Sequence, residues 1–344
     1  MKTKTLRKSK RRTPTHAPTL LAVGAPTVLA MFFSRQKIKG EAIRLLIGAV
    51  LLLMAGSANA LKGEKTLACV AIQWEDGREL SAEKCRNVAE NVADFYNRNS
   101  RGVLKLKPLG VEVDVPYKKT TGNLGAAEAM AKRKVKADYY IIPALWKNGG
   151  NHASGKIAHV VQLTGWVVIH EVGHLLGLGH SGQYSYNKNG VPHLANYGDA
   201  DSPMGNNGSK FLNGPNYHRL GWLPKDEVAT YDPSVRIYEF KKVSNFKGDG
   251  LTALLIPRPN GRQTVVSYPI SCDACVALYL TSGGGTQKVG LTKAEWKDNT
   301  FTGIRLKVLD FNSGKVRVEV TQELRDRDLE ELADEEETSE EIFE

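Results

Sequence analysis

One stretch of the chain brings three histidines and a glutamate together at a spacing that suits a metal site. His170 and His174 are four residues apart, so on a helix both imidazoles lie on one face and reach a single ion. Glu171 is rotated about 100° from His170, which places its carboxylate beside the metal without making it a ligand. Gly177 permits the φ > 0 conformation that ends a helix, so that His180 can return as a third ligand. Three histidine ligands leave one position of a tetrahedral zinc ion for water, as in catalytic sites.

The element that carries these residues also has an apolar side. Val168, Val172 and Leu175 fall opposite the histidines on a helix. We expect this face to pack against a sheet, which would make the helix a rigid mount for the ligands.

A second signal follows at residues 201–205, which read Asp-Ser-Pro-Met-Gly. Pro203 and Gly205 suit a tight turn. By itself, Met204 between them would be an ordinary loop residue.

These motifs resemble those of the metzincin zinc metalloproteases. The run from His170 to His180 has their H-E-x-x-H-x-x-G-x-x-H pattern, and Met204 matches their methionine-containing turn. The resemblance implies that Met204 supports the histidines from below by packing, not by coordination. Within this group the chain is similar to the gametolysin-like metalloproteases, which carry Tyr-Gly-Asp, Met-Gly and Leu-Gly-Trp-Leu segments after the zinc helix. Here those segments lie at 197–199, 204–205 and 220–223. Matrixins, the nearest alternative, lack the last one.

The resemblance implies one catalytic Zn²⁺ ion, with Glu171 as the general base and a protein or peptide substrate, such as a cell-wall or matrix glycoprotein. It also places an edge strand just before the zinc helix, where an extended substrate could pair with the sheet. The residues expected in that strand are Lys156, Ile157, Ala158, His159 and Val160. The chain departs from the family because no propeptide of useful length separates Leu61 from the first strand. No cysteine is positioned to block the zinc.

Other polar residues near the motif have simpler expected roles. Because three histidines complete the protein's share of the metal site, we expect the remaining ones to be surface or loop residues: His152, His159, His193 and His218. Asp199 and Asp201 lie in a loop rich in Gly and Asn, and we expect them to form turns rather than to bind calcium.

The charge of the chain is unevenly distributed. The 344 residues include 47 Lys and Arg against 37 Asp and Glu, a net charge of +10. The first 60 residues hold 11 basic residues and one acidic residue, whereas the tail from residue 322 holds 12 acidic residues and two arginines. The part between them has no dense basic run, so we expect no nucleic-acid partner. An apolar content of 41% rules out disorder of the whole chain.

The N-terminal 60 residues predict a signal peptide. Basic residues up to Arg44 precede an apolar block at 45–54, and Ala58 and Ala60 form an A-x-A cleavage site. The mature chain would begin at Leu61, and Met31 is a possible true start. The apolar block is shorter than the roughly 20 residues of a spanning helix, so a membrane anchor is the less favoured alternative. We expect a secreted protein without stable membrane insertion.

The four cysteines suit an exported protein, in which disulfides persist. Cys69 lies in a strand-like run and Cys85 in the helical pattern after it, whereas Cys272 and Cys275 form a C-x-x-C pair. Of the three possible pairings we expect Cys69 with Cys85 and Cys272 with Cys275. No further ligands for a structural zinc are evident near the C-x-x-C pair.

The remaining sequence predicts an α+β catalytic domain followed by β structure. Residues 65–78 predict a strand and turn, and residues 81–97 a helix. Further strands are expected at 103–107, 111–115, 139–145 and 156–163. From Pro224 on, short β-branched runs indicate a small β-sandwich, with strands at 235–240, 252–256, 264–268, 276–281, 303–308 and 315–321.

The expected domains are therefore four. The N-terminal extension and signal peptide cover 1–60, and a catalytic domain covers 61–224, for which the resemblance implies a metzincin-type mixed sheet with an active-site helix and methionine turn. A β-rich domain covers 225–321, and an acidic, disordered tail covers 322–344. The expected function is a secreted zinc endopeptidase. The alternative is a non-catalytic secreted protein that binds a wall or matrix and retains a relic zinc site.

Overall fold

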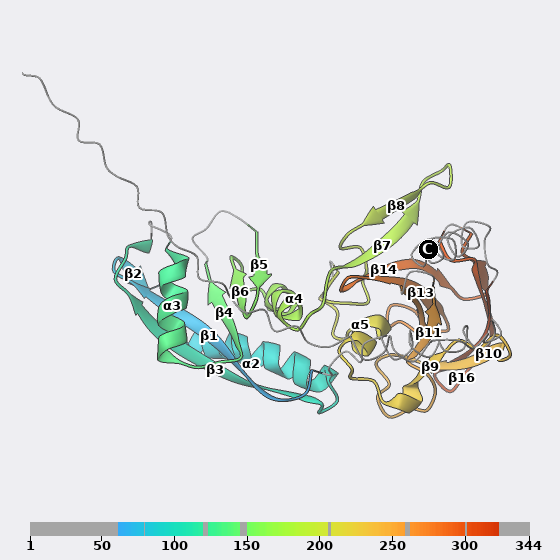
Figure 1. Cartoon of the computed structure of the whole chain (residues 1–344), viewed down its shortest axis with the longest axis horizontal. Coiled ribbons are helices and arrows are strands. Elements are labelled where there is room, and N and C mark those ends of the chain that lie inside the picture. Colours follow the sequence, from blue (N-terminus) through green and yellow to red (C-terminus); the bar gives the residue numbers. More distant parts are fainter. Residues whose placement is uncertain are drawn as a thin grey trace, which may run out of the picture. The chain divides into compact units, whose positions relative to one another are not determined.

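The computed structural model describes residues 61–78, 80–119, 123–144, 150–205, 208–258, 262–299 and 301–322 (Figure 1). All of them fall within one compact unit, residues 54–344. The expected signal peptide at 1–60, with the possible start at Met31, lies outside the described residues, as does the acidic tail beyond residue 322. Within the described ranges, no helix is long and apolar enough to cross a membrane.

Six strands form the first sheet, in the order β2-β1-β4-β6-β5, with β3 paired to β1. Their bounds are Gly63–Trp74 (β1), Gly77–Arg78 (β2), Leu104–Val115 (β3), Tyr139–Pro143 (β4), His152–Ser154 (β5) and Ile157–Val160 (β6). β1, β3, β4 and β6 run parallel, whereas β2 and β5 are antiparallel to their neighbours. The two strands predicted at 103–107 and 111–115 are one continuous strand, β3.

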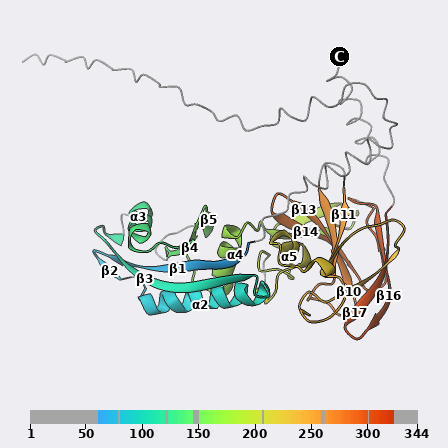
Figure 2. The ribbon, with the colours of Figure 1, turned by 60° about the horizontal axis from the view of Figure 1, so that its bottom comes forward.

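Helices cover both faces of this sheet. Alternate residues of β1 point to opposite faces, so Leu67 packs with helices α2 (Ala82–Asn99) and α4 (Gly165–Leu175), and Ala68 packs with α3 (Leu124–Lys134). Figure 2 shows α2 and α3 on opposite sides of the strands. Helix α3 was not predicted from the sequence.

Helix α2 follows its local sequence closely. Ser81 caps it by accepting a hydrogen bond from the backbone N–H of Lys84, as its position before the apolar stripe suggests. The disulfide Cys69–Cys85 joins the helix to β1, which confirms that pairing. Gly110 of β3 allows the close approach, because a Cβ there would collide with the carbonyl oxygen of Ala82.

The edge of the first sheet lies one strand further out than predicted. The segment Lys156, Ile157, Ala158, His159 and Val160 was expected at the edge, but its strand β6 pairs with β4 on one side and with β5 on the other. β5 is therefore the terminal strand at this end of the described sheet. Its three residues are too few to show the alternation by which strands are predicted.

Strands from Ser181 onward form two further sheets that share an apolar core. The seven-stranded sheet has the order β8-β7-β14-β13-β12-β11-β9, and the four-stranded sheet has the order β10-β17-β16-β15. Their strands are β7 (Ser181–Tyr186), β8 (Pro192–Ala195), β9 (Val228–Thr230), β10 (Ile237–Lys241), β11 (Ala253–Pro257), β12 (Gln263–Ser267), β13 (Val276–Ser282), β14 (Gly285–Thr292), β15 (Glu295–Lys297), β16 (Ile304–Asn312) and β17 (Lys315–Gln322). Phe240, Leu278 and Val318 belong to this core.

The seven-stranded sheet crosses the predicted domain boundary at residue 224. β7 and β8 precede that boundary, yet β7 pairs in parallel with β14. The helix α5 (Gly214–Arg219) and the 3-10 turn η2 (Lys225–Glu227) lie in the sequence between β8 and β9 of this sheet. The fold is thus a mixed α+β arrangement with mixed sheets, in which β7 begins directly after His180.

Candidate metal centre

The structure brings His170, His174 and His180 together as one group that could hold a metal ion. One ring nitrogen from each lies within 4.8 Å of the others. Nε2 of His170 and Nε2 of His174 are 3.1 Å apart. Two ligands of a tetrahedral zinc ion at 2.0–2.1 Å would be about 3.4 Å apart, so binding requires only a small movement of the rings.

Backbone carbonyls orient two of these rings. Nδ1 of His170 donates to the carbonyl of Pro203 at 2.9 Å, and Nδ1 of His174 donates to the carbonyl of Leu178 at 2.8 Å. With Nδ1 protonated in this way, Nε2 of each ring keeps the lone pair that a metal needs. Burial lowers the pKa of His170 to about 4, so this imidazole is neutral and able to ligate at physiological pH.

The turn after α4 delivers His180. Gly177 adopts φ 89°, as predicted, and the N–H of Leu178 donates back to the carbonyl of Gly173 at 3.0 Å. The N–H of Gly179 then donates to the carbonyl of Gly284, and the carbonyl of His180 accepts from Thr286. Backbone hydrogen bonds to the start of β14 therefore hold the third ligand in place. The residues around His180 in the sequence do not predict this contact.

Met204 packs beneath α4. It is fully buried, and a Cβ on Gly173 would collide with its sulfur. Gly173 occupies one of the variable positions between the first two histidines, so its small size is required by Met204 and not by the metal. The same loop supplies the Pro203 carbonyl to His170.

Glu171 lies beside the histidines in a cavity of about 600 Å³ that they line together. It is only 6% exposed, and its Oε2 atom has no hydrogen-bond partner among the described residues. Burial raises the pKa of this carboxyl to about 7, so both of its protonation states are accessible near neutral pH. A group that takes up and returns a proton needs this property.

Tyr197 also belongs to the site, although sequence reasoning gave it no role beyond the family resemblance. Its hydroxyl lies 3.1 Å from Nε2 of His180, and its ring centre is 4.3 Å from that imidazole. The hydroxyl is therefore within hydrogen-bond distance of one ring nitrogen of the third histidine. The position of Tyr197 could not be predicted from its distance in sequence to the histidines. The loop that brings it to the site is stabilised by residues that are distant in the sequence.

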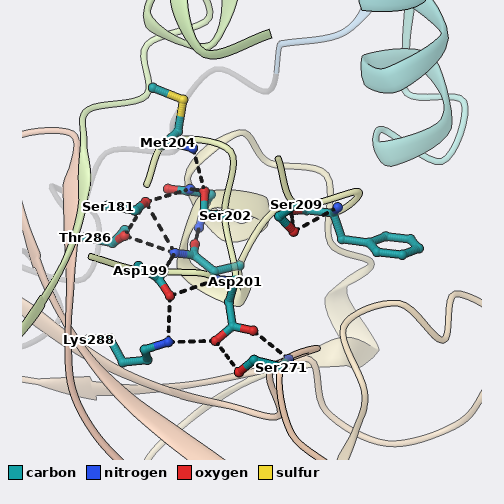
Figure 3. Close-up of polar contacts among 12 residues, drawn as sticks. Ser181, Asp199, Asp201, Ser202, Met204, Ser209, Ser271, Thr286 and Lys288 are labelled. Carbon is teal, nitrogen blue, oxygen red and sulfur yellow. Dashed lines mark hydrogen bonds and ion pairs between the residues drawn. The ribbon is translucent and has the colours of Figure 1, made fainter. Parts of the chain in front are cut away.

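A buried ion pair stabilises that loop (Figure 3). Nζ of Lys288, on β14, lies 2.8 Å from Asp199 Oδ1 and 2.8 Å from Asp201 Oδ2, and both carboxylates are fully buried. Burial alone would lower the pKa of Lys288, but the two carboxylates outweigh it and raise the pKa above its usual value. Asp201 also accepts hydrogen bonds from the backbone N–H and the hydroxyl of Ser271.

The expected role of the two aspartates was therefore incomplete. Asp199 does form a local turn, because its carboxylate accepts from the N–H of Asp201 at 3.0 Å. Its other oxygen accepts from Asn213 of the loop before α5. Both aspartates thus connect the loop to distant elements in addition to shaping it.

Two of the four histidines expected at the surface lie elsewhere. His159 is buried on β6, and His218 is half-buried in α5, where burial lowers its pKa. His193 is exposed on β8, and His152 is exposed on β5. His152 nevertheless lines the same cavity as Glu171, so it is a site residue that sequence reasoning missed.

No protein-family model matches the chain, and no curated protein is significantly similar to it.

The chemistry of the three histidine side chains restricts which metal ions the site could bind. Three imidazole ligands suit zinc, copper, iron or nickel and do not suit magnesium or calcium, which prefer oxygen ligands. The disulfide Cys272–Cys275, which lies next to Ser271, confirms the second predicted pairing.

Proposed function

We propose that this chain is a secreted zinc-dependent endopeptidase of the metzincin type, similar to the gametolysin-like metalloproteases. One observation carries the proposal: three histidines whose ring nitrogens converge share an open cavity with a buried, unpaired carboxylate oxygen of Glu171. A purely structural metal site would have four protein ligands and no such carboxylate.

Glu171 supplies proton transfer in this scheme. Its carboxylate takes a proton from the attacking water and returns it to the departing amine when the peptide bond breaks. A zinc ion, when bound, supplies the positive charge that polarises the scissile carbonyl and acidifies the water. The hydroxyl of Tyr197 can donate a hydrogen bond to a substrate oxygen in the same cavity.

The cavity is open to an extended substrate. It lies beside β5, the terminal strand of the described sheet, and an extended peptide could add to that strand through main-chain hydrogen bonds. The proposed substrate is a protein or peptide. Wall or matrix glycoproteins are proposed on the family resemblance.

Export is supported by both disulfides, which persist in oxidising compartments. The proposed mature start, Leu61, is fixed to the domain by its backbone. Its N–H donates to the carbonyl of Leu220, and its carbonyl accepts from the indole of Trp222 at 2.8 Å. N-terminal sequencing of secreted material should therefore find Leu61 or a close neighbour.

The test is cleavage of casein or gelatin by the purified mature chain, with and without a chelator. We expect cleavage that a chelator abolishes and that added zinc restores, whereas added magnesium should not restore it. A chain that binds zinc but cleaves neither substrate would instead support the non-catalytic binding protein.

A further inference from the structure

A chain of three ionisable side chains connects α3 to the rim of the candidate site. Nδ1 of His159 lies 3.0 Å from Nε2 of His152, and Nε2 of His159 lies 3.0 Å from Oε1 of Glu128. The two histidines are directly opposite each other in the antiparallel pair of β5 and β6. His159 is buried, whereas His152 is exposed and lines the cavity with Glu171.

This cluster does not have the geometry of a second metal site. His159 uses its two ring nitrogens in opposite directions, one toward each neighbour. In the described part of the chain, the only group whose ligand atoms converge is His170, His174 and His180. The cluster is instead a hydrogen-bonded series that starts at a carboxylate and ends in the cavity.

The partners determine where the protons lie. A carboxylate can only accept, so Nε2 of His159 carries a proton. In the neutral state of the two rings, Nδ1 of His159 then has no proton and accepts a hydrogen bond from Nε2 of His152. A neutral imidazole holds a single proton, so Nδ1 of His152 keeps a lone pair. The bond to His159 leaves this Nδ1 available to the cavity.

We propose that His152 is a substrate-binding residue that accepts a hydrogen bond at Nδ1 from a main-chain N–H of the bound peptide. His159 and Glu128 are positioning residues that fix the ring and its tautomer. The assignment rests on the proposed endopeptidase function. It follows from the place of His152 on the terminal strand, where an extended peptide would present its main-chain N–H groups.

The test compares His152→Ala with His193→Ala, since His193 is an exposed histidine on β8 outside the described lining of the cavity. A hydrogen bond between neutral groups predicts that His152→Ala lowers kcat/KM about two- to tenfold, mainly by raising KM. Bound zinc should not change, whereas the denaturation midpoint should fall because buried His159 loses a hydrogen-bond partner. His152→Gln, which keeps an acceptor oxygen, should recover part of the loss in KM, and His193→Ala should behave as wild type.

Glu128→Gln measures the positioning role. It should raise KM in the wild-type background and have no further effect in the His152→Ala background, because it acts through that ring. An unchanged KM in His152→Ala, or an equal effect of Glu128→Gln in both backgrounds, would overturn the inference while leaving the proposed function intact. A wild-type chain without chelator-sensitive cleavage would overturn both.

Discussion

The buried contact between Lys288 and two aspartates predicts a large effect from a single substitution. Lys288→Met keeps the length of the side chain and removes its charge. Asp199 and Asp201, both 0% exposed, would then remain in the interior without a cation. Removing one partner of a buried ion pair costs about 3–5 kcal/mol, and here one cation serves two carboxylates. We therefore expect the free energy of unfolding to fall by at least about 3 kcal/mol.

The same substitution should weaken metal binding. Asp199 and Asp201 shape the loop that presents the Pro203 carbonyl to His170. Loss of a partner that orients a metal ligand typically lowers affinity about 10–100-fold. Zinc affinity measured by competition with a fluorescent chelator should fall within that range.

A surface pair gives the matched control. Nζ of Lys315 lies 2.8 Å from Glu239, the same separation as in the buried pair, but the two side chains are 29% and 43% exposed. Lys315→Met should leave the free energy of unfolding essentially unchanged, because water screens the pair. Urea denaturation of both variants measures the difference. If Lys288→Met were no more destabilising than Lys315→Met, the view that the buried pair stabilises the site would be refuted.

Two further predictions concern α4 and the connection between its domain and the β sheets. Gly173→Ala would place a Cβ against the sulfur of Met204, so it should lower the free energy of unfolding by about 1–3 kcal/mol and reduce zinc binding. Gly165→Ala, in the same helix, places its Cβ in open space and should leave the free energy of unfolding unchanged. Burial would raise the pKa of Glu227, but hydrogen bonds from Arg101, Lys241 and Thr252 outweigh it and hold the pKa below its ordinary 4.5. The contribution of ionised Glu227 to the free energy of unfolding is therefore complete above pH 4.5 and lost at lower pH. Between pH 7 and pH 3.5, the free energy of unfolding should fall less in Glu227→Gln than in the wild type, as measured by denaturation at both pH values. An equal fall in the two proteins would contradict this.

The sequence predicted those parts of the site that depend on neighbouring residues. His170 and His174 are related by one helical turn, and Gly177 ends the helix with the expected positive φ. The Cys69–Cys85 bridge was predictable because a strand followed by a packed helix brings those positions together. Each of these features depends on residues that lie close together in the sequence.

The features that were missed depend on contacts between distant segments. Lys288 meets Asp201 across 87 positions of sequence, and nothing near either residue signals burial. His159 was expected at the surface because three other histidines already complete the metal site, but Glu128 and His152 supply partners that allow it to be buried. Helix α3, which carries Glu128, is rich in Ala and Lys, so its periodic apolar pattern is weak.

The most direct test of the central claim pairs bound zinc per chain with peptidase rate in two variants. Glu171→Gln keeps the size of the side chain and removes its basicity, so it should retain about one zinc ion and lose roughly 10²–10⁴ in turnover. His174→Ala should lose most of its bound zinc and, with it, activity. Near-wild-type turnover in Glu171→Gln, or full zinc occupancy in His174→Ala, would contradict the assignment of the base and the ligands.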